Sequence, residues 1–299
     1  MTTGQTEARH ESGKGLDAMP PADILRILAA GQQAAAQAVD SAIPSIADAS
    51  TIAADCLGKG GRLIYVGAGS SGLMAMADAL ELPGTYGISK EQVVILIAGG
   101  NASLSDLAGG YEDDTDLARE DMAAVSPVAD DCVICVSASG STPYVVAAAE
   151  IAKTCGASVV AIANNAGARL FADANISILI ETPPEVIAGS TRMGAGTAQK
   201  IALNMFSTLV GILLGHVHDG HMVNLRADNE KLRIRASRIV SDIAGLDVAE
   251  ANALLDRAAG SVKAAILLSA GTPDRREAEE LLAASGQSLR RALAKAGKY

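Results

Sequence analysis

Apolar residues along the first two thirds of this chain alternate between two patterns. Five short runs are apolar almost throughout, and they read RLIYVGA, QVVILIA, DCVICVSA, ASVVAIA and NISILIET. A turn signal follows each run and, after most of them, apolar residues recur at helical spacing. Strands that are apolar on both faces and joined by crossovers are typical of a parallel sheet covered by helices. We therefore expect an α/β fold with a doubly wound parallel sheet of about five strands.

The flanking segments have other patterns. Residues 1–20 are polar and predict a loose arm, and the stretch up to the first strand predicts two helices broken at Pro44. After the last strand, residues 189–220 predict one long helix with a cap at Ser190 or Thr191.

From about residue 228 onward the pattern is helical throughout. Segments that start at residues 251 and 278 share a Leu-Leu pair, a Ser and a terminal apolar residue, which is a weak repeat of 27 residues. We interpret the repeat as a duplication of packing within a small helical bundle. The expected organisation is an N-terminal arm and helices over 1–50, an α/β domain over 51–227 and a C-terminal helical domain over 228–299.

Composition and charge narrow the functional classes. The chain is 49% hydrophobic but only 2% aromatic, so the core must consist of Ala, Val, Ile and Leu. A net charge of -10 argues against non-specific binding to nucleic acid. No apolar run reaches the roughly 18 residues of a membrane helix, and the N-terminus lacks the apolar centre of a signal peptide. We expect a cytoplasmic protein with no nucleic-acid and no membrane partner.

Cys132 and Cys135 form a C-x-x-C pair, which in other contexts indicates a metal or redox site. Here the pair lies in a predicted strand, where residues three apart point to opposite faces of the sheet. We therefore expect buried, unpaired thiols.

The first strand ends in a glycine loop, VGAGSSG, in which Gly67, Gly69 and Gly72 have the spacing G-x-G-x-x-G. A dinucleotide loop also needs an acidic residue at the end of the second strand, and that strand ends in Ala-Gly-Gly. Ser70 and Ser71 stand instead at the predicted helix start, where hydroxyls and free N–H groups can hold a small anion.

A second hydroxyl-rich loop, SASGSTPY, follows the third strand. It supplies Ser137, Ser139, Ser141 and Thr142 directly before a helix. Ligands of open α/β sheets bind at the carboxyl ends of the strands, so the two loops together predict a phosphate site. The alternative is that these hydroxyls only cap helices.

The two loops resemble those of the sugar isomerase domain, which binds phosphorylated sugars. Longer matches, from about residue 6 to the C-terminus, resemble the N-acetylmuramic acid 6-phosphate etherase family, and they read GGRLIYVGAGSSG, DALELPGTYG, LIAGG, GYEDD, GSTRMGAGTAQK and NEKLRIRASRIV. The resemblance implies a homodimer that cleaves the lactyl ether of a phosphorylated amino sugar in cell-wall recycling, with no cofactor and no metal. The expected substrate-binding residues are Gly69, Ser70, Ser71, Ser137, Ser139, Ser141, Thr142, Ser190 and Thr191.

The resemblance also assigns two catalytic carboxylates. It makes Glu112, in YEDD, the base that removes the C2 proton, and Glu81, in DALE, the acid that protonates the departing ether oxygen. Taken alone, Glu81 has the pattern of a solvated helix residue and Glu112 that of a loop charge. An aldose-ketose isomerase, which needs no acid at the ether oxygen, and a non-catalytic sugar-phosphate sensor stay open as alternatives.

Some residues depart from the family pattern. Leu73, Ser141 and Gly194 stand where the family usually carries cations, and Leu80 replaces a Ser. Either these positions are peripheral, or the substrate is a less anionic phosphosugar.

A histidine cluster, His216, His218 and His221, is also foreign to the family. Its spacing could hold a transition metal, but we interpret it as a helix end with incidental histidines, because the implied reaction needs no metal.

Overall fold

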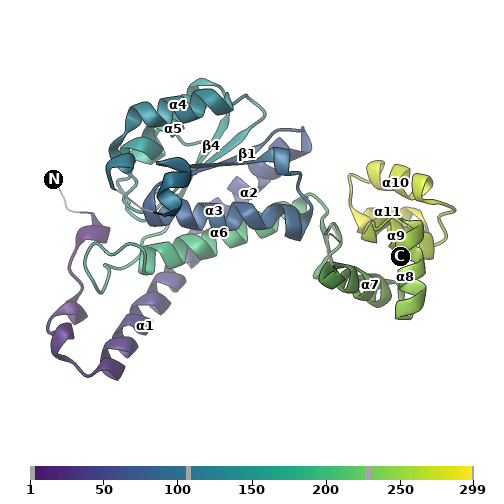
Figure 1. Cartoon of the computed structure of the whole chain (residues 1–299), viewed down its shortest axis with the longest axis horizontal. Helices are drawn as coiled ribbons and strands as arrows, with labels where there is room; N and C mark the ends of the chain where they lie inside the picture. Colours follow the sequence, from purple (N-terminus) through teal and green to yellow (C-terminus); the bar gives the residue numbers. More distant parts are fainter. Residues whose placement is uncertain (1–3, 106–108, 226–229, 298–299) are drawn as a thin grey trace. The chain divides into compact units, whose positions relative to one another are not determined.

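The computed structural model describes residues 4–105, 109–225 and 230–297. Its main sheet has five parallel strands in the order β2-β1-β3-β4-β5 (Figure 1). The strands are β1 (Leu63–Gly67), β2 (Val93–Ile97), β3 (Cys132–Val136), β4 (Ser158–Ala163) and β5 (Ile176–Leu179). All five predicted strands are confirmed. The strand order reverses between β1 and β3, and the loops after these two strands are the glycine loop and the serine loop of the sequence.

Helices cover both faces of the sheet, which confirms the doubly wound class. Figure 1 shows α4 (Thr115–Val125) and α5 (Pro143–Thr154) on one face. On the other face lie α2 (Ile43–Gly58) and the first parts of α3 (Gly69–Tyr86) and α6 (Gly194–Leu213). Because helices pack on both sides, β1 and β3 are buried at every position.

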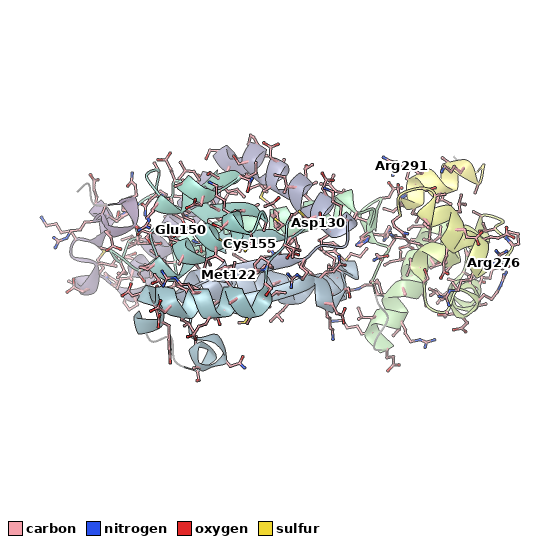
Figure 2. The ribbon with its side chains drawn as sticks, turned by 90° about the horizontal axis from the view of Figure 1, so that it is seen from above. Met122, Asp130, Glu150, Cys155, Arg276 and Arg291 are labelled. Carbon is pink, nitrogen blue, oxygen red and sulfur yellow. The ribbon has the colours of Figure 1, made fainter. Side chains whose placement is uncertain are left out.

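The core is made of small aliphatic side chains with few aromatics, as the composition predicts. Cys132 and Cys135 are 0% exposed in β3, which confirms the expectation of buried thiols. Cys155, at the C-terminal end of α5, is exposed instead (Figure 2).

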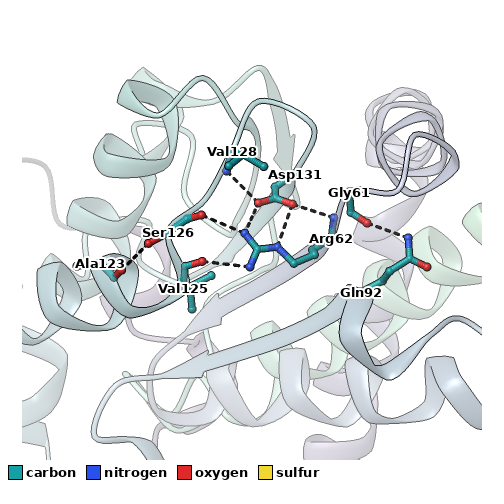
Figure 3. A network of polar contacts seen from close by, with 8 residues as sticks. All are labelled: Gly61, Arg62, Gln92, Ala123, Val125, Ser126, Val128 and Asp131. Atoms are coloured by element: carbon teal, nitrogen blue, oxygen red, sulfur yellow. Dashed lines mark hydrogen bonds and ion pairs between the residues drawn. The ribbon is translucent and has the colours of Figure 1, made fainter.

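A partly buried ion pair joins the amino-terminal ends of β1 and β3 (Figure 3). Arg62 Nη2 lies 2.6 Å from Asp131 Oδ2, and the backbone N–H of Arg62 donates to Oδ1 at 2.9 Å. The guanidinium also donates to the carbonyls of Val125 and Ser126, each at 3.1 Å. Burial raises the pKa of Asp131, but the hydrogen bonds from Arg62 outweigh that effect and lower it overall. This pair lies at the amino-terminal ends of the strands, whereas the two loops lie at the carboxyl ends.

The described part of the N-terminal arm is mostly exposed, but it forms short turns and is held to the rest of the protein at a few buried residues. Three short 3-10 turns (Gln5–Glu7, Glu11–Gly13 and Leu16–Ala18) precede α1 (Pro21–Gln37). Thr6 and Leu16 are 3% and 7% exposed.

The predicted cap of α6 is also wrong. The helix begins at Gly194, and the carboxylate of Glu185 accepts the N–H groups of Gly194 and Ala195, both at 2.9 Å. A negative charge at a helix N-terminus is favourable, so Glu185 stabilises the start of α6 in place of Ser190 or Thr191.

The predicted long helix stops earlier than expected, at Leu213, because Gly215 adopts a left-handed conformation. Of the histidines that follow, His216 bonds back to Gly211 O at the end of the helix, whereas His218 and His221 lie on a small antiparallel hairpin, β6 (Val217–His218) and β7 (His221–Met222).

The chain divides into two compact units: residues 1–79 with 91–207, and residues 80–90 with 208–299. The second unit contains α7 (Glu230–Ala244), α8 (Val248–Arg257), α9 (Val262–Ser269), α10 (Arg275–Ala283) and α11 (Leu289–Lys295) around a core of its own. This confirms the C-terminal helical bundle.

The sequence repeat corresponds to a repeat of structure. Asp247 and Asp274 cap α8 and α10, and Ser261 and Ser288 cap α9 and α11. In each of these two pairs the second residue follows the first by 27 positions, so the repeat reproduces two helix starts as well as apolar contacts. Among the described residues, no helix is long and apolar enough to cross a bilayer.

Candidate functional site

The glycine loop brings the end of β1 and the start of α3 into direct contact. A Cβ at Gly67 would stand 2.6 Å from the Cα of Gly72, so only glycine allows this approach. Gly69 begins α3 with a φ of +51°, a left-handed conformation that favours glycine. Ser70 and Ser71 follow it in the first turn, half-buried and buried respectively.

Glu112 lies against this loop. Its Oε1 is 2.5 Å from the point where a Cβ would stand on Gly69, so the carboxylate occupies the space that the glycine leaves free. Glu112 belongs to the 3-10 turn Gly109–Asp113 that precedes α4. Partial burial, and then the neighbouring charge of Asp113, raise the pKa of Glu112. A carboxylate with a raised pKa at the carboxyl ends of the strands is a plausible proton acceptor in chemical terms.

The serine loop is a hydrogen-bonded network of hydroxyls. Ser137 Oγ lies 2.8 Å from Thr142 Oγ1 and 3.4 Å from Ser139 Oγ, and it accepts the N–H of Gly140 at 3.0 Å. Ser141 donates its hydroxyl to Ser139 Oγ at 3.1 Å. Thr142 is the N-cap residue of α5, but its side chain makes no capping bond to that helix. The hydroxyls are therefore engaged mainly with one another, which does not match the alternative that they serve as helix caps.

The backbone of this loop is fixed by its neighbours. The N–H of Ser137 donates to Ile162 O at 3.1 Å, and Leu170 N donates to Gly140 O at 2.9 Å. Gly140 has a φ of +67°, and a Cβ there would stand 2.2 Å from that of Ala168. These contacts make the loop a preformed structure.

A cleft of about 510 Å³ opens beside the serine loop in the first unit. Ser139 and Ser141 contribute to its lining, together with Asn165, Glu181 and residues 4–7 of the arm. Ser137 and Thr142 lie behind them in the hydroxyl network, and they are buried and half-buried.

Ser190 and Thr191 are half-buried in the turn before α6. The carbonyl of Thr191 accepts the N–H of Gly196 at 2.8 Å. The preceding residue, Gly189, donates its N–H to Thr6 O at 3.2 Å, which joins this turn to the arm. Neither residue is among those that line the cleft beside the serine loop.

Glu81 belongs to the second unit, whereas Glu112 belongs to the first. Glu81 is exposed on α3. Its neighbours in the chain are Leu80, which is 63% exposed, and Leu82, which is 1% exposed. The structure thus brings Glu112 together with Gly69, and it brings the serine-loop residues together with one another.

The three positions that lack family cations have different surroundings. Ser141 is exposed and lines the cleft, so a cation there would face a ligand. Leu73 is half-buried in the first turns of α3. Gly194 is buried, and a Cβ there would stand 3.0 Å from Glu185 Oε2 and 3.2 Å from Ala35 Cβ. Only Ser141 is therefore placed to alter the charge of the cleft.

The histidines of the hairpin have separate environments. Burial lowers the pKa of His216 to about 4, and His218 is 4% exposed with its Nε2 3.5 Å from Asp219. Within residues 4–105, 109–225 and 230–297, no group of three or more His, Cys, Asp or Glu side chains could hold a metal ion.

Two residues that the sequence analysis did not single out make several hydrogen bonds each, and one of them contacts the site. Asn165, after β4, bonds to both the arm and the serine loop. Asp78, on α3, is 3% exposed and accepts hydrogen bonds from Tyr65, Asn204 and Ser207 at 2.9 to 3.1 Å. The Asn-Asn pair after β4 was a usable signal for Asn165, but nothing in the helical pattern distinguishes Asp78 from a surface carboxylate.

Comparison with known proteins identifies the family. Residues 28–164 match the SIS domain family. A protein of Deinococcus radiodurans is 42% identical over 95% of this chain and 93% of its own, and one of Geobacillus thermodenitrificans is 41% identical over 96% and 98%. One of Streptomyces coelicolor is 43% identical over 99% and 95%. All three bear the name N-acetylmuramic acid 6-phosphate etherase. Since this similarity runs along nearly the whole of both chains, the protein belongs to the N-acetylmuramic acid 6-phosphate etherase family.

Proposed function

We propose that this protein is a carbon-oxygen lyase that cleaves the C3 lactyl ether of N-acetylmuramic acid 6-phosphate. The products are N-acetylglucosamine 6-phosphate and D-lactate, which places the enzyme in cell-wall sugar recycling. The names and close similarity of the relatives support the reaction. The observation that carries it in this chain is the position of Glu112 against Gly69, in the loop after β1.

The phosphate is proposed to bind at the serine loop and the first turn of α3. Hydroxyls of Ser139 and Ser141 face the cleft, and Ser70 and Ser71 stand beside the free N–H groups of a helix start. Helix N-termini and hydroxyls together favour an anion without any cationic side chain. Phosphate bound in this region would put the sugar near Glu112.

The proposed chemistry moves protons and needs no redox step. In the open-chain sugar, the C1 aldehyde acidifies the C2 proton, and Glu112 removes it as the base. The electron pair left on C2 forms a double bond to C3, and the C3–O bond breaks. Glu81 donates a proton to the departing lactate oxygen, and water then adds to C3 of the unsaturated aldehyde to give the product.

The assembly and cellular location are part of the same proposal. We propose a homodimer in which apolar residues exposed in the monomer are covered, among them Leu25 on α1, which is 65% exposed. We also propose that the enzyme is cytoplasmic. The proposed domains are residues 1–50, 51–227 and 228–299.

A lactate assay tests the proposal directly. Purified protein is incubated with N-acetylmuramic acid 6-phosphate, beside Glu112→Gln and Glu81→Gln variants. Loss of a general base or acid typically lowers the rate by about 10²- to 10⁴-fold, so lactate should form with the unaltered protein and fall by that factor in each variant. Exchange of the C2 proton with solvent, without lactate, would identify an isomerase. Ligand binding with neither reaction would identify a sensor.

One observation favours a second candidate, an etherase-like lyase for a less anionic phosphosugar. The cleft beside the serine loop is lined by Ser141 and by the carboxylates Glu7 and Glu181, and none of the described residues that line it is a cation. Such a lining does not attract a second anionic group such as the lactyl carboxylate. Comparing the turnover of phosphosugar ethers with and without a carboxylate decides between the two substrates.

A further inference from the structure

Residues 4–7 form what we call the N-terminal strap. Its central residue, Thr6, is 3% exposed, although it lies at the polar start of the chain. The strap lines the same cleft as Ser139 and Ser141, so a segment remote in sequence completes the wall beside the serine loop. The burial of Thr6 is not explained by the hydrophobic effect, because the arm is polar and the ends of a chain are ordered only where specific contacts hold them.

Asn165 provides the link between the strap and the serine loop. Its Oδ1 accepts the N–H of Thr6 at 3.3 Å, and its Nδ2 lies 3.0 Å from Thr6 Oγ1. The same Nδ2 lies 3.4 Å from Ala138 O and 3.3 Å from Ser139 O. One amide group therefore contacts the strap on one side and two carbonyls of the serine loop on the other.

The strap is anchored at a second point. Thr6 O accepts the N–H of Gly189 at 3.2 Å, in the turn that carries Ser190 and Thr191. Gly4 packs so closely on Asn165 that a Cβ there would stand 3.0 Å from its Oδ1. Thr6 thus contacts the turn before α6 directly, and it contacts the serine loop after β3 through Asn165.

We propose that Thr6 and Asn165 are positioning residues for the phosphosugar. Asn165 holds the carbonyls of Ala138 and Ser139 and so fixes where the hydroxyls of Ser139 and Ser141 point, and Thr6 fixes the orientation of Asn165. The strap then forms the wall of the cleft against which the sugar packs. This inference rests on the proposed function, because it requires the serine loop to bind the phosphate.

A purely structural tether would give a different result from a positioning role. A tether contributes to the free energy of unfolding, and its loss leaves ligand affinity unchanged as long as the protein is folded. A positioning residue sets the geometry of the bound state, so its loss weakens binding in the folded protein. The two roles separate when affinity and thermal stability are measured on the same samples.

The test uses the full chain and four variants. Thr6→Val keeps the shape of the side chain and removes the hydroxyl, and Thr6→Ser keeps the hydroxyl. Asn165→Ala removes the amide. Thr154→Val is the matched control, because it removes an exposed hydroxyl that bonds only to Glu150 O at the far end of α5. Calorimetry measures the Kd of inorganic phosphate and of N-acetylglucosamine 6-phosphate, and thermal unfolding confirms that each variant is folded.

We expect Thr6→Val to raise the Kd of both ligands about five- to tenfold, as the loss of one hydrogen bond does. Asn165→Ala should raise the Kd more. Thr6→Ser should stay within about twofold of the unaltered protein, and Thr154→Val should show no change. The inference is overturned if Thr6→Val and Asn165→Ala are folded and bind both ligands as the unaltered protein does. Failure of the unaltered protein to bind either ligand would overturn the phosphate site itself, and the inference with it.

Discussion

The carboxylate of Glu112 lies against the backbone of Gly69, with Oε1 2.5 Å from the point where a Cβ would stand. Only glycine, which has no Cβ, leaves this space free for the carboxylate. The glycine loop, whose spacing first suggested a dinucleotide site, thus makes room for a carboxylate from the segment after β2.

This contact predicts that Gly69→Ala inactivates the protein. The new methyl group would displace the carboxylate, and a φ of +51° costs an alanine about 1 kcal/mol. A displacement of about 1 Å can cost 10²-fold in rate, so we expect kcat for lactate release to fall by at least tenfold. Gly84→Ala is the control, because Gly84 lies on the same helix with nothing within 4 Å of a Cβ. Full activity in Gly69→Ala would show that Glu112 does not need this position.

The raised pKa of Glu112 predicts a pH dependence of activity. A base must be ionised, so kcat should fall as the pH drops through a value above the ordinary 4.5 of a glutamate. The sign for stability is the opposite. A carboxyl whose pKa is raised by folding favours the folded state at low pH, and this contribution is lost as the pH rises through the raised pKa.

Glu112→Gln should therefore stabilise the ligand-free protein at pH 7 relative to the unaltered protein, and should not do so near pH 4. Thermal unfolding at the two pH values measures the difference. An equal effect of the substitution at both pH values would contradict the raised pKa.

Restoring a cation at Ser141 should change the preference between ligands. Ser141→Arg places a guanidinium at an exposed position of the cleft, where an ion pair is worth up to about 1 kcal/mol. We expect the substitution to raise the affinity for N-acetylmuramic acid 6-phosphate up to about fivefold more than the affinity for N-acetylglucosamine 6-phosphate, which lacks the lactyl carboxylate. Titration of both ligands against Glu112→Gln proteins with and without Ser141→Arg measures this without turnover. Equal changes would mean that position 141 faces the phosphate.

Gly194→Lys should act on stability instead. Its Cβ would press on Ala35 and on the carboxylate of Glu185 that caps α6. Loss of a helix cap costs about 1 kcal/mol, so we expect a lower Tm with no gain in affinity for either ligand. A gain in affinity specific to the lactyl sugar would place position 194 at the ligand.

The ion pair between Arg62 and Asp131 predicts a large loss of stability on Asp131→Asn. The carboxylate is 1% exposed, and breaking a buried pair costs about 3 kcal/mol. Because folding lowers the pKa of Asp131, its contribution is present above the unfolded value of about 3.9 and is lost as the pH falls. The difference between Asp131→Asn and the unaltered protein should thus shrink toward pH 3. Asp173→Asn, which breaks a pair with Lys153 in which both side chains are partly exposed, should cost less than about 1 kcal/mol.

The sheet could be predicted from the sequence because the central strands β1 and β3 are buried on both faces, and burial of that kind leaves an unbroken apolar run. The helical bundle could be predicted because its apolar spacing repeats. The cap of α6 could not, since Glu185 is nine residues before Gly194 and reaches the helix through a turn. A local pattern favours the nearest hydroxyl, and here a more distant carboxylate takes its place.

The position of the strap could not be predicted either, because its partner is still more distant in the sequence. Thr6 and Asn165 are 159 residues apart, and neither has a pattern that points to the other. The hydroxyl-rich loops were visible because they follow strands directly. What joins them depends on tertiary contacts, which a single sequence does not display.

The repeated helices of the second unit have a kinetic consequence. In that unit α8 packs on α9, α9 on α10, and α10 on α11, so its partners are neighbours in the chain. In the sheet, the first residue of β1 pairs with the first of β3, Leu63 with Cys132, across more than sixty intervening residues. Closing long loops slows folding, whereas local contacts form within microseconds to milliseconds. During refolding, amide protons of α8–α11 should therefore become protected from exchange before those of β1 and β3.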